Sequence, residues 1–150
     1  MTDIDFYILS DDKAQNHEPQ SHEVLMCRLA EKIHTLGHSI HINTDSTNQA
    51  TQLDELLWSF KDGSFLPHQI QNNDKPDNEN AYSTIVIGIN EEPLTQADVL
   101  LNMAASVPLF FSRFERVTEI VSPLQQHKKS ARERYGFYRD RGYKITSHNI

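Results

Sequence analysis

The sequence predicts an α/β fold in which helices flank a mainly parallel central sheet. Two strand–helix pairs follow one another in the first 60 residues, an alternation typical of parallel strands joined by crossover helices. A continuous run of mostly β-branched residues, 83–90, is typical of a strand that is buried on both faces. The chain has 150 residues, of which 37% are hydrophobic, so we expect 1–150 to form a single domain with one core.

The first strand and helix of the chain are marked by apolar pattern and capping residues. A short apolar run at 4–9 predicts a buried strand, and residues 38–43 alternate in the manner of a second strand. Between them, Ser21 offers an N-cap, and apolar residues then recur at helical spacing. Gly37 is a typical residue to end that helix.

The second helix begins at a capping box. Ser46 and Gln49 have the spacing in which a hydroxyl and an amide side chain satisfy backbone groups at a helix start. After this helix, we expect 61–70 to form a turn and a loop. Because the next residues are polar and low in complexity, we expect a flexible surface loop over 69–82 within the single domain.

The C-terminal part supplies further strands and a terminal helix. Residues 98–103 and 116–122 predict two strands, with a helical turn at 107–114 between them. Pro123 suits the first turn of a helix, so the spacing predicts a terminal helix over 124–141.

Composition argues against several classes of protein. The net charge of −7 disfavours non-specific binding of nucleic acid by the whole surface. No apolar run approaches the ~20 residues of a membrane span, and the N-terminal residues lack the basic region of a secretory signal. The single cysteine, Cys27, excludes an internal disulfide and fits a reducing compartment. We therefore expect a cytoplasmic protein that does not bind membranes.

No motif predicts a catalytic residue, a cofactor or a metal. With five glycines, the chain has neither of the glycine-rich loops that hold phosphates. Gly37 interrupts the helix between His34 and His38, so we expect ordinary surface or interface histidines there and at His41. Cys27 has no evident base partner, and we expect a packed thiol. A Mg²⁺ site remains an alternative, resting on acidic residues after the first two strands: Asp11, Asp12 and Asp45.

A basic segment, 127–144, stands out in this acidic chain. It contains seven of the 14 Lys and Arg residues against two acidic residues. At 100° per helical residue, four side chains fall within an arc of about 60°. We call them the basic face: Lys128, Arg132, Tyr135 and Arg139. Arginine forks bind carboxylates with two hydrogen bonds and a tyrosine offers a flat apolar wall, so this face suits an acidic peptide with a hydrophobic end or a terminal carboxylate.

Two other interpretations of the basic segment remain open from the residues alone. The first is a solvated helix whose positive charges complement the helix dipole. The second is a surface for single-stranded DNA, in which arginines hold phosphates and tyrosines stack on bases, although the net negative charge weakens it. In each case we expect Ala131, Phe137 and Tyr138 to point in other directions and to pack on the sheet.

A second aromatic cluster lies at 53–68. Its four large apolar side chains surround a helix end and a Gly turn: Trp58, Phe60, Phe65 and Leu66. These side chains could fill the core of the domain, or they could anchor a protein–protein interface; the sequence is consistent with both.

Three strings together resemble a known family. They are "DFYIL" near the start, "LDELLWSF" with "SFLPH" in the middle and "ARERYGFYRDRGY" near the end. In this order and spacing the chain resembles the chi subunit of bacterial DNA polymerase III, an accessory protein of the clamp loader. The resemblance spans nearly the whole chain and is loose at 69–83 and 98–103.

The resemblance implies a Rossmann-like, non-catalytic α/β protein with two partners. Members pair with the psi subunit and bind the acidic C-terminal tail of the single-stranded DNA-binding protein, which ends in aspartates followed by Ile-Pro-Phe. The matching motif would place this tail on the basic face (Lys128, Arg132, Tyr135 and Arg139), with Val121 near the floor of the pocket. Trp58 and Phe65 match positions used against psi and against a helicase. Gly136 departs from the pattern, which often has a lysine there.

We therefore expect a replication adaptor that links the clamp loader to coated single-stranded DNA. It would need no cofactor and would not itself bind nucleic acid, and polymerase activity would belong to the complex rather than to this chain. Two alternatives remain: a small nucleotide-binding α/β enzyme, and a protein that binds single-stranded DNA directly through the basic segment.

Overall fold

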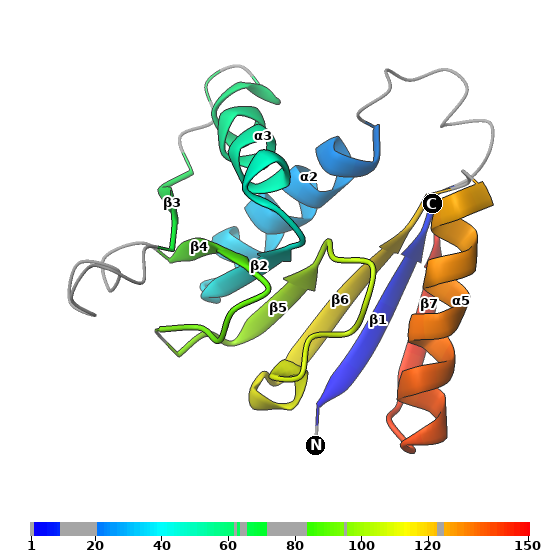
Figure 1. Ribbon diagram of the computed structural model, residues 1–150. Helices are drawn as coiled ribbons and strands as arrows, with labels where there is room; N and C mark the ends of the chain where they lie inside the picture. Colours follow the sequence, from blue (N-terminus) through cyan, green and yellow to red (C-terminus); the bar gives the residue numbers. More distant parts are fainter. Residues whose placement is uncertain are drawn as a thin grey trace.

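The computed structural model describes residues 2–9, 21–61, 63, 66–71, 84–94, 96–122 and 125–150 (Figure 1). Its strands form one seven-stranded sheet in the order β3-β4-β2-β5-β6-β1-β7, and every neighbouring pair is parallel. The strands are β1 (Asp3–Ile8), β2 (Ile40–Thr44), β3 (His68–Ile70), β4 (Ile85–Ile89), β5 (Val99–Asn102), β6 (Arg116–Val121) and β7 (Ile145–Asn149). The predicted α/β class with a mainly parallel sheet is confirmed.

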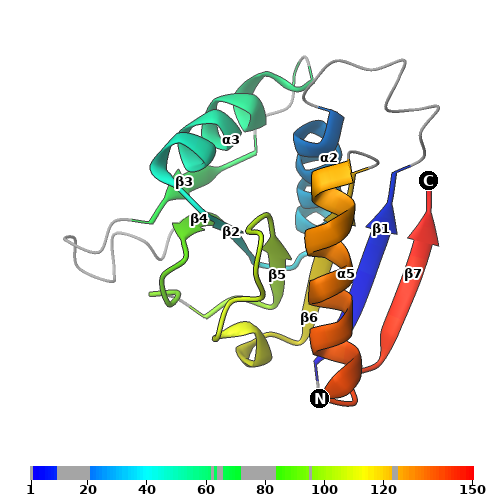
Figure 2. The same ribbon diagram turned by 45° about the vertical axis from the view of Figure 1, so that its right-hand side comes forward.

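Three α-helices in the described part of the chain cover the two faces of this sheet. They are α2 (Ser21–Thr35), α3 (Thr47–Ser59) and α5 (Gln125–Asp140), and a single 3₁₀ turn, η1, spans Phe111–Arg113. Figure 2 shows α5 in front of the sheet, with α2 behind it. One core lies between α2, α3 and strands β2, β4 and β5, and a second, aromatic core joins α5 and η1 to β1 and β6.

Local signals in the sequence explain where two helices begin or end. The Ser46 hydroxyl accepts a hydrogen bond from the Gln49 backbone N–H at 3.1 Å, which caps the start of α3 as predicted. Gly37 ends α2 with a φ of +90°, a conformation that favours glycine.

Two strands were not predicted. Residues 61–70 were expected to be turn and loop, but His68–Ile70 forms β3 beside β4. The expected loop therefore does not include residues 69 and 70, and its residues 72–82 lie outside the described part. Ile145–Asn149 forms β7, although its sequence ITSHN has no apolar run. Both strands lie at the edges of the sheet, where one neighbour and little apolar pattern are sufficient.

The terminal helix lies close to its predicted position. α5 covers 125–140 where 124–141 was predicted, and the helical turn expected at 107–114 is η1. Pro123 lies outside the described residues. Among the described residues, no helix has the length and apolar content needed to cross a membrane.

Candidate functional site

Helix α5 packs one side against the sheet, and the adjacent side of the helix is exposed to solvent. Ala131 and Tyr138 are buried beneath the helix, as predicted. The side chains of Arg132 and Arg139 are exposed, that of Lys128 is half-buried, and Tyr135 is 37% exposed. The four residues of the basic face therefore lie along one flank of α5, with at least part of each side chain open to solvent.

The cationic groups of the basic face are free or weakly engaged. Lys128 and Arg132 form no hydrogen bond or ion pair with any residue that the structure describes. Among the described residues, Arg139 pairs only with the neighbouring Asp140 carboxylate, at 3.3 Å, and both side chains are about two-thirds exposed. Water and salt screen such an exposed pair, which contributes little. All three cations are therefore available to an acidic ligand.

Tyr135 rests on the first strand of the sheet. Its ring meets that of Phe6 in β1 edge-on, with 5.3 Å between the ring centroids. Val121, at the end of β6, is half-buried and packs on the aromatic core that contains Phe6. The predicted aromatic wall and the predicted floor residue thus border the same core, while cations line the exposed flank of the helix.

Arg134 is a buried cation that the sequence analysis did not single out. It is only 7% exposed, and its Nε donates to Glu119 Oε1 at 2.8 Å. One guanidinium nitrogen also donates to the carbonyl of Ala105 at 3.1 Å and to the Ser130 hydroxyl at 3.2 Å. At 100° per residue, Arg134 lies 40° from Tyr138 and 60° from Ala131, and so on the inward side, which was one signal available in the sequence.

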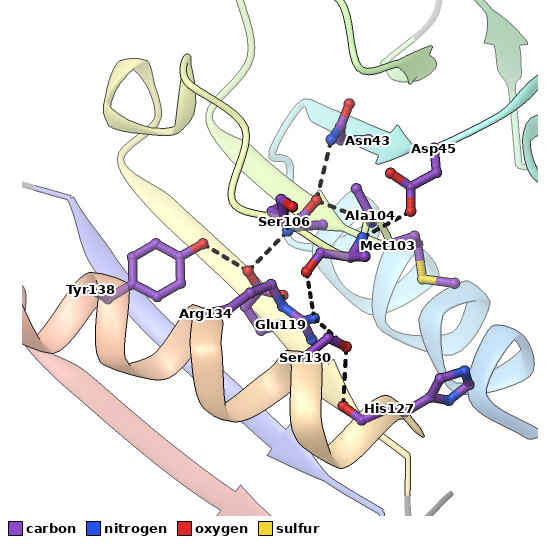
Figure 3. A network of polar contacts seen from close by, with 12 residues as sticks. Asn43, Asp45, Met103, Ala104, Ser106, Glu119, His127, Ser130, Arg134 and Tyr138 are labelled. Atoms are coloured by element: carbon purple, nitrogen blue, oxygen red, sulfur yellow. Dashed lines mark hydrogen bonds and ion pairs between the residues drawn. The ribbon is translucent and has the colours of Figure 1, made fainter. Parts of the chain in front are cut away.

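Glu119 is the centre of the polar network in Figure 3. Its second oxygen accepts hydrogen bonds from the Tyr138 hydroxyl at 2.7 Å and from the Asn102 amide at 3.0 Å. Complete burial raises the pKa of the Glu119 carboxyl, and Arg134 together with the hydrogen bonds opposes that rise. Burial also raises the pKa of Tyr138, so its hydroxyl remains a proton donor to the carboxylate.

Arg141 is occupied within the chain as well. Its guanidinium carbon lies 3.5 Å from the centroid of the Phe137 ring, a cation–π contact, and it donates to the Phe137 carbonyl at 3.2 Å. Phe137 in turn packs on the aromatic core, as predicted. The basic segment therefore contains two cations, Arg134 and Arg141, that serve internal contacts.

The second predicted surface contains Trp58 at the end of α3. Trp58 is 54% exposed, and its ring lies on that of His68 with centroids 4.3 Å apart. The His68 ring is held by the carbonyl of Leu66 at 2.7 Å and that of Asp54 at 3.1 Å. Leu66 itself is buried, whereas Phe65 lies outside the described residues. Trp58 is therefore an exposed aromatic side chain that packs against a ring held in place by hydrogen bonds.

The histidines considered as metal ligands lie apart in the fold. His34 bonds to Thr84 and His38 pairs with Asp98. The expectation of a surface or interface histidine was wrong for His41, which is buried because it lies in β2, between β4 and β5. No group of three or more potential metal ligands occurs among the residues that the structure describes.

Cys27 and Asp45 both have structural surroundings. Cys27 is buried, as predicted, and burial raises its pKa to about 12. The Asp45 carboxylate accepts from the Asn90 amide and the Ala105 backbone N–H. The other two residues of the Mg²⁺ alternative, Asp11 and Asp12, lie outside the described part of the chain.

A hollow of about 540 Å³ lies on the other face of the sheet, beside α2. Its buried carboxylate, Asp5, is paired with Arg116 and lies 3.1 Å from His148. Because these partners satisfy Asp5 within the chain, the unpaired cations of α5 remain the better candidate for ligand binding.

Comparison with known proteins identifies the family. Residues 1–146 match the family described as DNA polymerase III chi subunit, HolC. The chain belongs to the DNA polymerase III chi subunit family. DNA polymerase III subunit chi of Pseudomonas aeruginosa is 31% identical over 150 residues, covering 100% of this chain and 98% of the relative. The proteins of the same name from Haemophilus influenzae and Escherichia coli are 27% and 26% identical to this chain. The matched regions cover 97% and 98% of this chain, and 95% and 97% of those two proteins.

This chi-family chain also shares its fold with a larger protein. The crystal structure of T4 UvsW superimposes with a TM-score of 0.69 and 10% identity, over 99% of this chain and 41% of that one. At this identity the likeness concerns the fold alone. Membership of the chi family makes the chain a replication accessory subunit, which agrees with the family resemblance inferred from its sequence.

Proposed function

We propose that this chi-family subunit is a non-catalytic adaptor that binds the acidic C-terminal tail of the single-stranded DNA-binding protein through the basic face of α5. The observation that carries the proposal is the set of unpaired cations beside Tyr135. Lys128 and Arg132 have no partner among the described residues, and Arg139 has only an exposed neighbour. Aspartates and a terminal carboxylate of the tail would supply the missing charges.

The aromatic end of the tail would meet the apolar part of the site. Tyr135 keeps one part of its ring on Phe6 and exposes the rest, and Val121 is half-buried nearby in the same core. A terminal phenylalanine would pack between such groups while the cations hold the acidic residues. For so small a contact we expect micromolar affinity, about −8 kcal/mol, that weakens as salt is added.

The test is the binding of a synthetic tail peptide to matched variants. Replacing Arg132 with Ala should weaken binding about tenfold or more, because a hydrogen bond between charged groups contributes about 1.5–3 kcal/mol. Lys129→Ala is the control, since Lys129 is exposed on the same helix but is rotated by about 60° to 120° from the four residues of the basic face. If calorimetry shows that Arg132→Ala binds the peptide as tightly as the parent does, the assignment of the site is wrong.

Trp58 is the proposed anchor for the psi subunit, together with Phe65, seven residues further along the sequence. An exposed indole that packs against a buried ring is typical of an interface anchor. Trp58→Ala and Phe65→Ala should each abolish co-purification with psi while the circular dichroism spectrum stays unchanged. Leu36→Ala removes another exposed apolar side chain and serves as control. If psi still co-purifies with both variants, this surface is not the interface. A helicase proposed for the same surface should compete with psi.

The two alternative functions predict different results. Direct binding of single-stranded DNA would shift a labelled oligonucleotide in a gel without the bridging protein, whereas the adaptor should leave it unshifted. A nucleotide-binding enzyme would gain thermal stability from at least one nucleotide in a panel, and the adaptor should gain none.

A further inference from the structure

The buried carboxylate of Glu119 binds two residues of α5 at once. Arg134 donates to one oxygen at 2.8 Å and Tyr138 donates to the other at 2.7 Å. The two residues are four positions apart, so they project from the same side of the helix. We call this arrangement the Glu119 clamp (Glu119, Arg134 and Tyr138). Neither Arg134 nor Tyr138 is exposed to a ligand, since both are at least nine-tenths buried.

The clamp and the basic face are neighbours in sequence. Tyr135 directly follows Arg134, and Arg139 directly follows Tyr138. Successive helical residues are rotated by 100° about the helix axis, so the basic face lies about 100° around α5 from the side that faces the sheet. Turning the helix by one residue about its axis would therefore expose clamp residues and bury basic-face residues.

Apolar packing alone is a weak determinant of that rotation. Contacts between hydrocarbon groups are non-directional, whereas two hydrogen bonds to one fixed carboxylate are directional. Glu119 is itself fixed at the middle of β6, between β5 and β1, and its second oxygen also accepts from Asn102. The clamp thus ties the rotation of α5 to the centre of the sheet.

The clamp is braced from a second direction. Arg134 also donates to the carbonyl of Ala105, in the loop that follows β5. That loop is held in turn by Asp45, which accepts from the Ala105 N–H at 2.8 Å, and by Asn102, which donates to the Ser106 carbonyl at 3.2 Å (Figure 3). The guanidinium therefore joins three elements: α5, β6 and the loop after β5.

We propose that Glu119 and Arg134 are positioning residues, which set the rotation of α5 and so aim the basic face at its acidic ligand. Arg134 contributes its charge to Glu119 and makes no contact with the ligand. This inference rests on the proposed function for its ligand, and it adds that a buried ion pair determines which cations of the basic segment meet the tail. Replacing a whole buried ion pair by apolar groups of similar volume is often neutral for stability, so a loss of positioning can be measured apart from a loss of stability.

The experiment removes the clamp by two routes. Arg134→Lys keeps the charge but loses the planar fork that reaches Glu119 and Ala105 together. The triple variant Glu119→Leu, Arg134→Met, Tyr138→Phe replaces all three clamp residues by apolar groups of similar size. Ile42→Val is the control, because it perturbs the other core without touching the clamp. Binding of the tail peptide is measured at a temperature at which urea unfolding shows every variant to be more than about 99% folded.

The positioning role predicts that both clamp variants bind the peptide at least about fivefold more weakly, while Ile42→Val binds it as the parent does. The nuclear Overhauser contacts between the Phe6 and Tyr135 rings should weaken in the same variants. The dependence of affinity on salt should be as steep in Arg134→Lys as in the parent, and less steep in Arg132→Ala, because Arg132 pairs with the peptide and Arg134 does not. If the triple variant does not fold, Arg134→Lys decides.

Parental affinity and intact ring contacts in Arg134→Lys would overturn the inference. If the parent protein itself does not bind the peptide, the proposed function fails, and the ring contacts alone then decide whether the clamp sets the rotation of α5.

Discussion

The ring of Phe6 in β1 meets the ring of Tyr135 in α5 edge-on at a centroid distance of 5.3 Å. These residues come from the first and the last of the three strings that carry the family resemblance. The middle string contains a similar pair, in which Trp58 lies on His68. An aromatic ring contact thus lies at each of the two proposed binding surfaces, and the first joins residues far apart in sequence.

The contact between Phe6 and Tyr135 should be measurable as a coupling energy. Edge-on aromatic pairs contribute about 0.5–1.5 kcal/mol beyond the area they bury. In a double-mutant cycle with Phe6→Leu and Tyr135→Leu, we expect a coupling of about 1 kcal/mol in urea unfolding. The cycle removes the contribution that Phe6 makes with Tyr138, because that contact is lost equally with either residue at 135. A coupling near zero would show that Tyr135 is not fixed by Phe6.

Replacing Gly136 should stabilise the protein. It lies in the interior of α5, and an added Cβ would meet only the end of the Arg139 side chain, at 3.7 Å. Gly136→Ala should therefore raise the free energy of unfolding by about 1 kcal/mol. Gly136→Lys should in addition strengthen binding of the tail peptide, because it adds a cation next to the basic face. Gly142→Ala is the matched control and should destabilise the protein, since its φ is +79°. Equal effects at 136 and 142 would contradict this account.

His41 should make the fold sensitive to mild acid. Burial lowers its pKa to about 4 from the ordinary 6.5, and its Nε2 has no hydrogen-bond partner among the described residues. The unfolded chain takes up a proton below pH 6.5 whereas the folded protein does not. The free energy of unfolding should therefore fall by up to about 3 kcal/mol as the pH drops from 6.5 to 4.

The measurement for His41 is urea unfolding between pH 4 and 8. His41→Leu should flatten this part of the pH profile, while the carboxylates common to both proteins contribute equally. Parallel profiles for the two proteins would mean that His41 does not cause the sensitivity.

Cys27 should be inert in the folded protein. Its side chain is buried, and the pKa of its thiol is raised to about 12. Because the thiolate is the reactive form, a thiol reagent such as Ellman's reagent should not react at pH 8 until urea unfolds the chain. Rapid reaction in the absence of urea would show that α2 opens locally.

The sequence predicted the parts of the fold that depend on apolar pattern. The central strands contain continuous apolar runs, and Ser46 and Gly37 mark helix ends by their local chemistry. The strand at 145–149 could not be predicted from pattern, because an edge strand is held by backbone pairing to β1 and needs few apolar residues.

The candidate site was predictable in part. Helical geometry places the four residues of the basic face on one flank of α5, and their role in binding stays a prediction. The burial of Arg134 was missed because cations are normally exposed. The signal was the acidic residue in the apolar strand RVTEIV: a carboxylate there requires a buried partner, and Arg134 supplies it.

The position of β1 in the sheet has a consequence for synthesis of the protein. β1 is made before the other strands of the described sheet, yet its partners among the described residues, β6 and β7, both follow residue 115. A nascent chain therefore exposes two unpaired edges and one apolar face of β1 until β6 and β7 have been made. Such long-range pairing forms slowly, and incomplete chains with unpaired strands are prone to aggregate. Production of this subunit should accordingly depend on protection of the β1 segment during translation.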